Sequence, residues 1–266
     1  MKKMVFAWIL LGLVVILVPS AWAGSSQAGG PVFFPVKDVS AFSKKVEKSL
    51  AKHGAKVAIV GRVGRPRKDL PRGIAFTHTG FAVYSKITTV DGRTLPGYAM
   101  YNLYQDSDIP DQSTLVLDYP VDFFAGVRVL EAGVIVPSPR LQAALLEILS
   151  SNIYTALHDP SYSAIANPYT LGFQNCTEHV LDILFAAIYG TDDMKKIKAN
   201  QTAYFKAQPV HVNPLKLALG RMFAPDITTA DHPGSPETAT FSTIGSFLTG
   251  FGLVSAQYVV LPGDAG

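Results

Sequence analysis

The sequence predicts an α+β fold in which an antiparallel sheet packs on a central, buried helix. Short runs rich in β-branched residues fill much of the first half of the chain, and Asp91-Gly92 is a typical hairpin turn. The segment 176–189 is apolar nearly all round, which is the pattern of a buried helix. No internal repeat or linker interrupts residues 37–262, so we expect them to form one domain.

The first residues have the pattern of an export signal. Lys2 and Lys3 precede an apolar run over 4–18, and Ala21-Trp22-Ala23 is the small-x-small pattern that signal peptidase cuts. The run is shorter than the roughly 20 residues of a membrane-spanning helix, which disfavours the alternative of an uncleaved anchor. We therefore expect a signal peptide over 1–23, cleavage after Ala23, a flexible segment over 24–36, and an exported, periplasmic protein without a membrane span.

The charge balance points away from nucleic acid as a partner. Loss of Lys2 and Lys3 with the signal leaves 21 basic residues against 20 acidic ones, whereas nucleic-acid binding needs a basic surface. No group of histidines or aspartates has the spacing of zinc or calcium ligands, so we expect no metal and no other cofactor. The sequence leaves the oligomeric state open.

Apolar periodicity and cap residues place the other elements. We expect a first helix that is capped by Asp38, buries one apolar stripe and ends at Gly54. Strands are expected over 57–63, 73–84, 98–104, 114–118, 127–136 and 257–261. Further helices are expected over 139–151, 176–189, 192–206, 213–222 and 241–251. This arrangement puts His78 and Asn102 on adjacent antiparallel strands.

Cys176 is a candidate nucleophile because of its position in the chain. It is the only cysteine, and it follows Asn175, which stands where a helix cap belongs. Glu178 lies three residues after Asn175, and the two together predict a capping box. Helix N-termini stabilise thiolates, which favours a reactive sulfur at this place. The alternative is an inert cysteine buried in the core.

His78 is the candidate base. Strand alternation puts it on one face with Gly80 and Ala82, and these small neighbours leave room for a sulfur atom. Asn102 could accept a hydrogen bond from the imidazole and so hold its tautomer. We therefore predict a catalytic unit of Cys176, His78 and Asn102. The alternatives are a hydrogen-bonded core histidine and a structural asparagine.

Three segments of the sequence resemble motifs of a known group of proteins. They are His78-Thr79-Gly80-Phe81-Ala82-Val83, Tyr101-Asn102-Leu103-Tyr104 and Gln174-Asn175-Cys176-Thr177-Glu178-His179-Val180. Together they look like the circularly permuted branch of the papain-like superfamily, which includes NlpC-type cell-wall peptidase relatives and the lecithin:retinol acyltransferase group. More closely, and over nearly the whole mature sequence, the chain resembles an uncharacterised family of exported bacterial proteins catalogued as DUF2145.

The resemblance implies a circularly permuted papain-like fold, with the histidine strand before the cysteine helix. It also implies Cys176 as nucleophile, His78 as base and Asn102 as the third member, where many permuted relatives have a histidine. The backbone N–H of Cys176 is the natural donor to an oxyanion, and Gln174 is a candidate for the second donor. The alternative for Gln174 is a loop side chain bonded to backbone.

These observations predict a periplasmic thiol hydrolase or acyltransferase, a cysteine peptidase, amidase or acyltransferase acting on an amide or ester bond. A cell-wall peptide or a lipid acyl group is the expected substrate. One alternative is a non-catalytic periplasmic binding or envelope-assembly module on the same fold. Another is a purely structural envelope protein with Cys176 buried.

Overall fold

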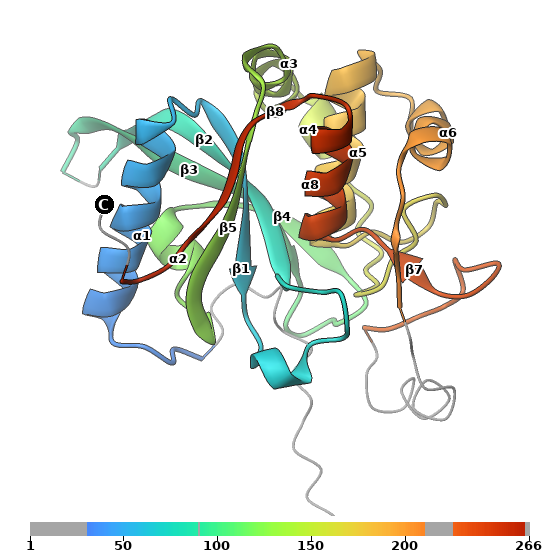
Figure 1. Cartoon of the computed structure of the whole chain (residues 1–266), viewed down its shortest axis with the longest axis horizontal. Coiled ribbons are helices and arrows are strands. Elements are labelled where there is room, and N and C mark those ends of the chain that lie inside the picture. The colour runs from blue at the N-terminus through green and yellow to red at the C-terminus, as the bar shows by residue number, and fades with distance from the viewer. Residues whose placement is uncertain (1–30, 90, 211–225, 264–266) are drawn as a thin grey trace, which may run out of the picture.

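The computed structural model describes residues 31–89, 91–210 and 226–263. Its centre is a six-stranded antiparallel sheet with the strand order β4-β3-β2-β1-β5-β8 (Figure 1). The strands are β1 (Val57–Val63), β2 (His78–Thr88), β3 (Thr94–Gln105), β4 (Ser113–Asp118), β5 (Val129–Pro137) and β8 (Val254–Val260). Strands β1 to β4 follow one another across the sheet, and β5 and β8 extend it beyond β1.

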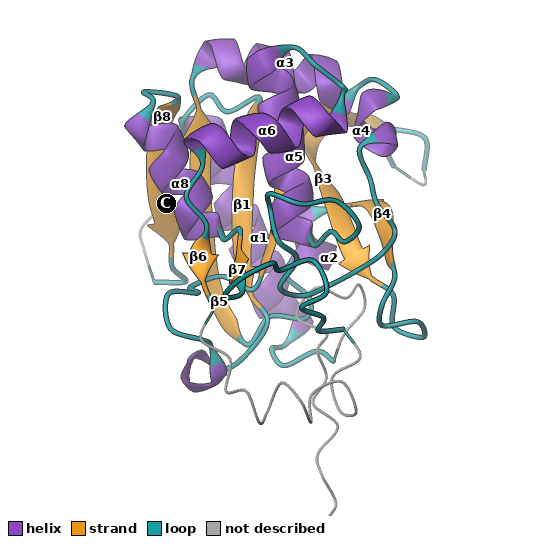
Figure 2. Ribbon diagram, turned by 90° about the vertical axis from the view of Figure 1, so that its right-hand side faces the viewer, coloured by secondary structure: helices purple, strands orange, loops and turns teal. Residues whose placement is uncertain are grey.

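Helices cover both faces of this sheet. On one face lie α1 (Val36–Lys52) and the short α2 (Pro120–Phe123). The other face carries a thicker layer, made of α3 (Pro139–Leu149), α4 (Ile153–Ala156), α5 (Cys176–Tyr189), α6 (Met194–Tyr204) and α8 (Phe241–Gly250) (Figures 1 and 2). A short 3-10 turn, η1 (Arg67–Asp69), follows β1, and β6 (Gln208–Pro209) pairs with β7 (Glu237–Thr238). We call the two sides of the sheet the α1 face and the α5 face.

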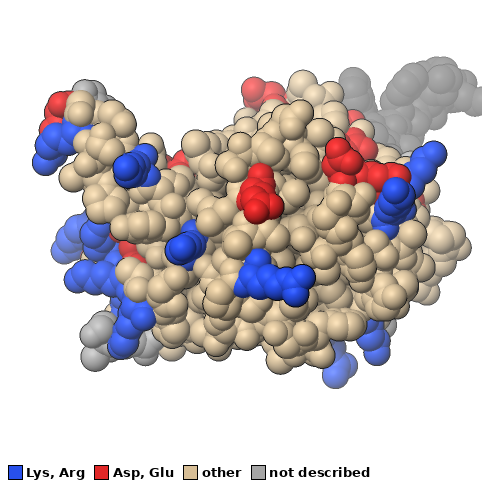
Figure 3. Space-filling model, turned by 90° about the horizontal axis from the view of Figure 1, so that it is seen from above, with Lys and Arg blue, Asp and Glu red and all other residues tan. Residues whose placement is uncertain are grey.

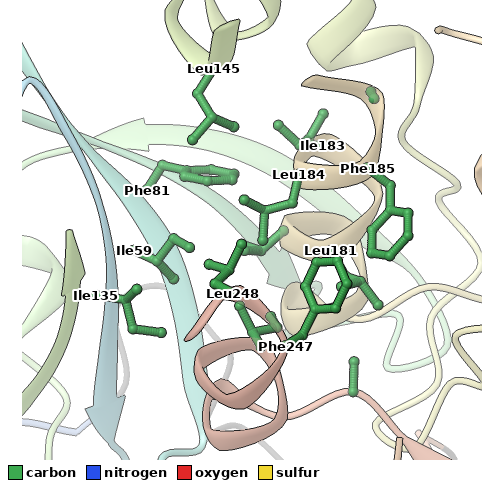
Figure 4. Close-up of a cluster of buried hydrophobic side chains, with 14 of the residues drawn as sticks. Ile59, Phe81, Ile135, Leu145, Leu181, Ile183, Leu184, Phe185, Phe247 and Leu248 are labelled. Carbon is green, nitrogen blue, oxygen red and sulfur yellow. The ribbon is translucent and has the colours of Figure 1, made fainter. Parts of the chain in front are cut away.

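The larger core lies on the α5 face. Figure 4 shows side chains of α5 and α8, among them Leu184 and Leu248, meeting Ile59, Phe81 and Ile135 of the sheet. All five of these side chains are fully buried. Because α5 has apolar residues on nearly every side, it packs against the sheet, α3, α6 and α8, as its sequence predicts.

The ends of α5 follow from two residues. The Asn175 side-chain oxygen accepts hydrogen bonds from the backbone N–H groups of Thr177 and Glu178, at 3.0 and 2.9 Å. Gly190 closes the helix in the left-handed conformation, with φ of 61°, which glycine adopts without strain. The predicted helix over 176–189 is therefore confirmed at both ends.

The α+β class and the antiparallel sheet packed on the cysteine helix are confirmed, with several corrections to the elements. The first helix begins at Val36 after Pro35, so Asp38 lies in its first turn and is not its cap. Strand β2 begins at His78, because residues 73–77 form a turn and an irregular stretch before it. The helix predicted over 192–206 begins at Met194, after Asp193 caps it. The short elements α2, α4, β6 and β7 were not expected.

Three predictions fall wholly or mostly on residues that the structure does not describe: the signal peptide over 1–23, the flexible segment over 24–36, of which 24–30 are not described, and the helix over 213–222. Within the described ranges, none of the helices has the length and apolar composition that crossing a bilayer requires. Seen from above, charged side chains are scattered over the face and gather mainly toward its margins (Figure 3).

Among the described glycines, Gly80 is the position at which an added Cβ atom would come closest to a neighbouring side chain. A Cβ atom at this position would lie 2.3 Å from Asn102 Oδ1 and 2.9 Å from the carbonyl oxygen of Tyr101. Both distances are below van der Waals contact, and the second atom belongs to backbone. The absence of a side chain at Gly80 therefore gives the Asn102 amide its place.

We expect Gly80→Ala to lower the free energy of unfolding by about 2 kcal/mol, the usual cost of overpacking a tight site. The measurement is urea denaturation followed by circular dichroism. Gly234→Ala is the control, because a Cβ atom there meets nothing within 4 Å. Equal stabilities of the two variants would contradict the proposed close contact.

Candidate functional site: the pocket at the start of α5

Cys176 lies at the first residue of α5 and faces the sheet. Its side chain is 4% exposed and packs with Leu103 of β3 and with Tyr162, beside Leu115 and Ala164. The cap formed by Asn175 fixes the first turn of the helix, so the position of the sulfur is set by the helix end. Cys176 is therefore neither fully exposed nor sealed in the main core.

A pocket opens beside Cys176. Its empty space is about 780 Å³, part of which is open to solvent. One wall is the segment between β1 and β2, and the opposite wall comes from Tyr162, Ala164, Ile165 and the chain around β7. The start of α5 forms the end at which Asn175, Cys176 and Thr177 lie. Most of the lining is apolar, and Arg65 is the one charged residue among the described lining residues.

His78 and Asn102 meet, as the sequence predicts. The His78 Nε2 atom lies 3.2 Å from Asn102 Oδ1, and Asn102 Nδ2 donates to Asp118 Oδ1 at 2.8 Å. Because the amide donates to a carboxylate at one end, its oxygen faces the imidazole, and Nε2 carries the ring proton. The other ring nitrogen, Nδ1, is buried and has no hydrogen-bond partner among the described residues.

The surroundings of His78 are aromatic and polar. Its ring stacks on Tyr104 at 4.7 Å between centroids and lies 5.4 Å from the Phe123 ring. Tyr104 donates its hydroxyl to Asp118 Oδ2 at 2.9 Å. The Arg62 guanidinium lies over the Tyr104 and Phe123 rings and donates to the backbone oxygen of Phe123. These side chains form one buried network under α2.

Burial controls the charges in this network. Burial, and then the Arg62 guanidinium, hold the pKa of His78 well below its ordinary value, while the bond to Asn102 opposes them only partly. His78 is therefore a neutral imidazole. Burial also raises the pKa of Asp118 to about 6, against the lowering effects of the Tyr104 hydroxyl and of Arg62.

The structure does not bring Cys176 to His78, which corrects the predicted three-residue unit. Ala82, which shares a strand face with His78, belongs to the core of the α1 face, and so does Phe123. Leu103, which contacts Cys176, projects from the opposite face, as Tyr101 does. Since side chains alternate along a strand, the sheet stands between the sulfur and the imidazole. His78 and Asn102 thus lie on the α1 face, and Cys176 lies on the α5 face.

Gln174 does not serve as an oxyanion donor in this arrangement. Its Nε2 donates to the Leu157 carbonyl oxygen at 3.0 Å and to Asp182 Oδ2 at 2.8 Å. Its Oε1 accepts from the backbone N–H of Asp159 at 3.0 Å. Gln174 is 1% exposed, and both ends of its amide are hydrogen-bonded within the protein. It is therefore a structural glutamine, which is the alternative that the sequence left open.

Glu178 also departs from its predicted role. The Asn175 half of the capping box is present, but the Glu178 carboxylate turns toward α6 and accepts from Lys198 Nζ at 2.6 Å. Lys198 Nζ also donates to Asp182 Oδ1 at 2.8 Å. Burial disfavours the charged form of Lys198, but the adjacent Asp182 and Glu178 carboxylates outweigh it and raise the pKa of Lys198. One buried ammonium therefore holds two carboxylates of α5.

The sequence reasoning missed Arg65, Asp118 and Lys198. Arg65 is the charged residue in the pocket wall, and the basic run after β1 was the signal that could have drawn attention to it. Asp118 and Lys198 offered no signal, because their partners are distant in sequence. Asp226, next to the pocket residue Ile227, is a further buried carboxylate, whose pKa is raised by burial and held down in part by Arg65. The described residues contain no cluster of histidine, cysteine and carboxylate groups that could hold a metal ion.

Fold and site together define a class of protein: an α+β protein with an antiparallel sheet between two helical layers and a pocket at a helix-capped cysteine. The chain belongs to a bacterial family described as "Uncharacterized protein conserved in bacteria (DUF2145)", whose model matches residues 49–248. This match spans all the strands of the central sheet except β8. No curated protein and no solved structure matches the chain.

We expect Lys198→Met to cost about 3 kcal/mol of unfolding free energy, because it leaves the Glu178 and Asp182 carboxylates buried without their cation. Urea denaturation at neutral pH measures this. Lys195→Met is the matched control, since Lys195 lies exposed on the same helix. If both variants unfold at the same urea concentration, Lys198 does not anchor α5 to α6.

Proposed function

We propose that this chain is a non-catalytic binding module of the bacterial cell envelope, and that its pocket holds the apolar part of a small ligand. The lining of the pocket carries this proposal. Among the described residues that line it, none is a histidine and Arg65 alone is charged. Concave sites with mostly apolar walls and a few polar groups are typical of small-molecule binding.

The polar end of the pocket suits a ligand with a hydrogen-bond acceptor. Thr177 and the Arg65 guanidinium line the pocket beside the first turn of α5, and the N-terminus of a helix favours negative charge. The export signal that the sequence predicts favours a ligand of the cell envelope. A lipid acyl group and a cell-wall peptide remain the two envelope molecules that suit this compartment.

A thiol hydrolase or acyltransferase on a circularly permuted papain-like fold is the second candidate. Two features favour it: Cys176 begins a buried helix at the wall of a pocket, and the histidine strand precedes that helix in the chain. The same two features support the permuted papain-like fold. Such an enzyme needs a base beside the sulfur, which His78 supplies only if it reaches the α5 face of the sheet.

The pocket can be tested with its own thiol, because Cys176 is the only cysteine of the chain. Octanol that occupies the pocket should slow the alkylation of Cys176 by iodoacetamide, measured by intact mass. Ile74→Trp fills the pocket with a larger side chain. We therefore expect this variant to need an octanol concentration at least tenfold higher to slow the alkylation of Cys176 to the same extent. Ile109→Trp is the control, since Ile109 is exposed and does not line the pocket.

Two results would contradict the binding proposal. One is octanol that gives no protection in the unmodified protein, and the other is equal protection in the two tryptophan variants. Cys176→Ser separates binding from catalysis when two quantities are measured. Calorimetric titration with octanol should show that a binding module keeps its affinity in this variant. A hydrolysis assay with an ester substrate should show that an enzyme acting through Cys176 loses its turnover.

A further inference from the structure

The segment that forms one wall of the pocket is strongly basic. Between β1 and β2 the chain has four basic residues and one acidic residue over 65–72, namely Arg65, Arg67, Lys68, Arg72 and Asp69. Leu70, Pro71 and Ile74 from the same segment line the pocket. The apolar wall and the positive charges therefore belong to one short stretch of chain, which turns through η1.

The basic residues of this segment differ in their partners. Arg67 forms an ion pair with Glu131 of β5, and Arg65 lies close enough to Asp226 to lower the pKa of that carboxyl. Lys68 and Arg72 are exposed, and neither has an ion pair with any of the described residues. Lys68 and Arg72 thus flank the lining residues Leu70 and Pro71 in the sequence, and their positive charges are available to an external anion.

Among the described residues that line the opposite wall, none is charged, and the neighbouring carboxylate of Asp226 is buried near Arg65. This wall consists of Tyr162, Ala164 and Ile165 together with Ile227 and residues 238–240, all of them uncharged. A ligand inside the pocket therefore meets mostly apolar walls, while any part of it that reaches the segment 65–72 meets positive charge. Low-dielectric walls strengthen the effect of such charges on a bound ion.

We infer that the ligand is an anionic amphiphile: an unbranched alkyl chain occupies the pocket, and its anionic head group lies against the segment 65–72. This inference rests on the proposed binding function and specifies its ligand class. Lys68 and Arg72 contact the head group. Arg65, which lines the pocket, lies beside the alkyl chain where that chain joins the head group. An uncharged amphiphile binds more weakly, and a cationic one is repelled.

Three probes with the same eight-carbon chain test this inference: octanoate, octanol and octyltrimethylammonium, each at monomeric concentration. Their protection of Cys176 from iodoacetamide gives the order of affinity, and calorimetric titration gives the same order without the thiol. We expect octanoate to bind roughly three- to tenfold more tightly than octanol, the range of one or two exposed ion pairs. Octyltrimethylammonium should bind the most weakly, and 0.5 M salt should remove most of the advantage of octanoate.

Charge reversal locates the effect. In Lys68→Glu/Arg72→Glu, octanoate should lose its advantage over octanol, whereas octanol affinity should stay the same. The control is Lys48→Glu/Lys52→Glu, which changes the net charge equally but places it on α1, on the other face of the sheet. This control should keep the preference for octanoate.

The outcomes separate this inference from the proposed function. If octanol and octanoate bind with equal affinity, or if both charge-reversal variants change the preference for octanoate equally, the recognition of an anionic head group is excluded. The binding of an alkyl chain in the apolar pocket is not contradicted by either result. If none of the three probes binds, the proposed binding function fails, and this inference fails with it.

Discussion

The burial of α5 is the constraint on which the rest of the structure depends. This helix is enclosed on nearly every side, yet it carries Glu178 and Asp182, two carboxylates that cannot reach water. Among the described residues, Lys198 from α6 is the cation that pairs with both of them, because buried charges need a partner to be tolerated. The contact fixes the first two turns of α5. The Asn175 cap, the Cys176 sulfur and the end of the pocket are fixed with them.

The sheet divides the polar chemistry of the molecule into two regions. On the α1 face, His78, Asn102, Tyr104 and Asp118 form a buried network whose imidazole is neutral. On the α5 face, Cys176 lines a pocket whose wall carries a basic segment. The network has the properties of a structural element, since a buried and hydrogen-bonded cluster specifies one packing arrangement. The pocket has access to solvent and is therefore the region that can meet a ligand.

The sequence predicts elements and shared faces well, but not which face meets which helix. Asn175 and Gly190 define both ends of α5, and alternation correctly groups His78 with Gly80 and Ala82. Both faces of this sheet are apolar and covered by helices, so alternation alone does not tell which side faces the cysteine. The room that Gly80 leaves is taken by the Asn102 amide and not by sulfur. Glu178 could not be assigned to Lys198, because the two are 20 residues apart and meet only through tertiary packing.

The separation of the Cys176 sulfur from the His78 imidazole is the central claim, and the pH dependence of thiol alkylation tests it most directly. The rate of reaction of Cys176 with iodoacetamide would be measured from pH 5 to pH 9 in the unmodified protein and in His78→Gln, with folding of both checked by circular dichroism. An imidazole beside a thiol forms an ion pair that keeps the sulfur reactive in mild acid. The account predicts rate profiles of the same shape in the two proteins. Loss of reactivity below neutral pH in His78→Gln alone would contradict it and would put the imidazole beside the sulfur.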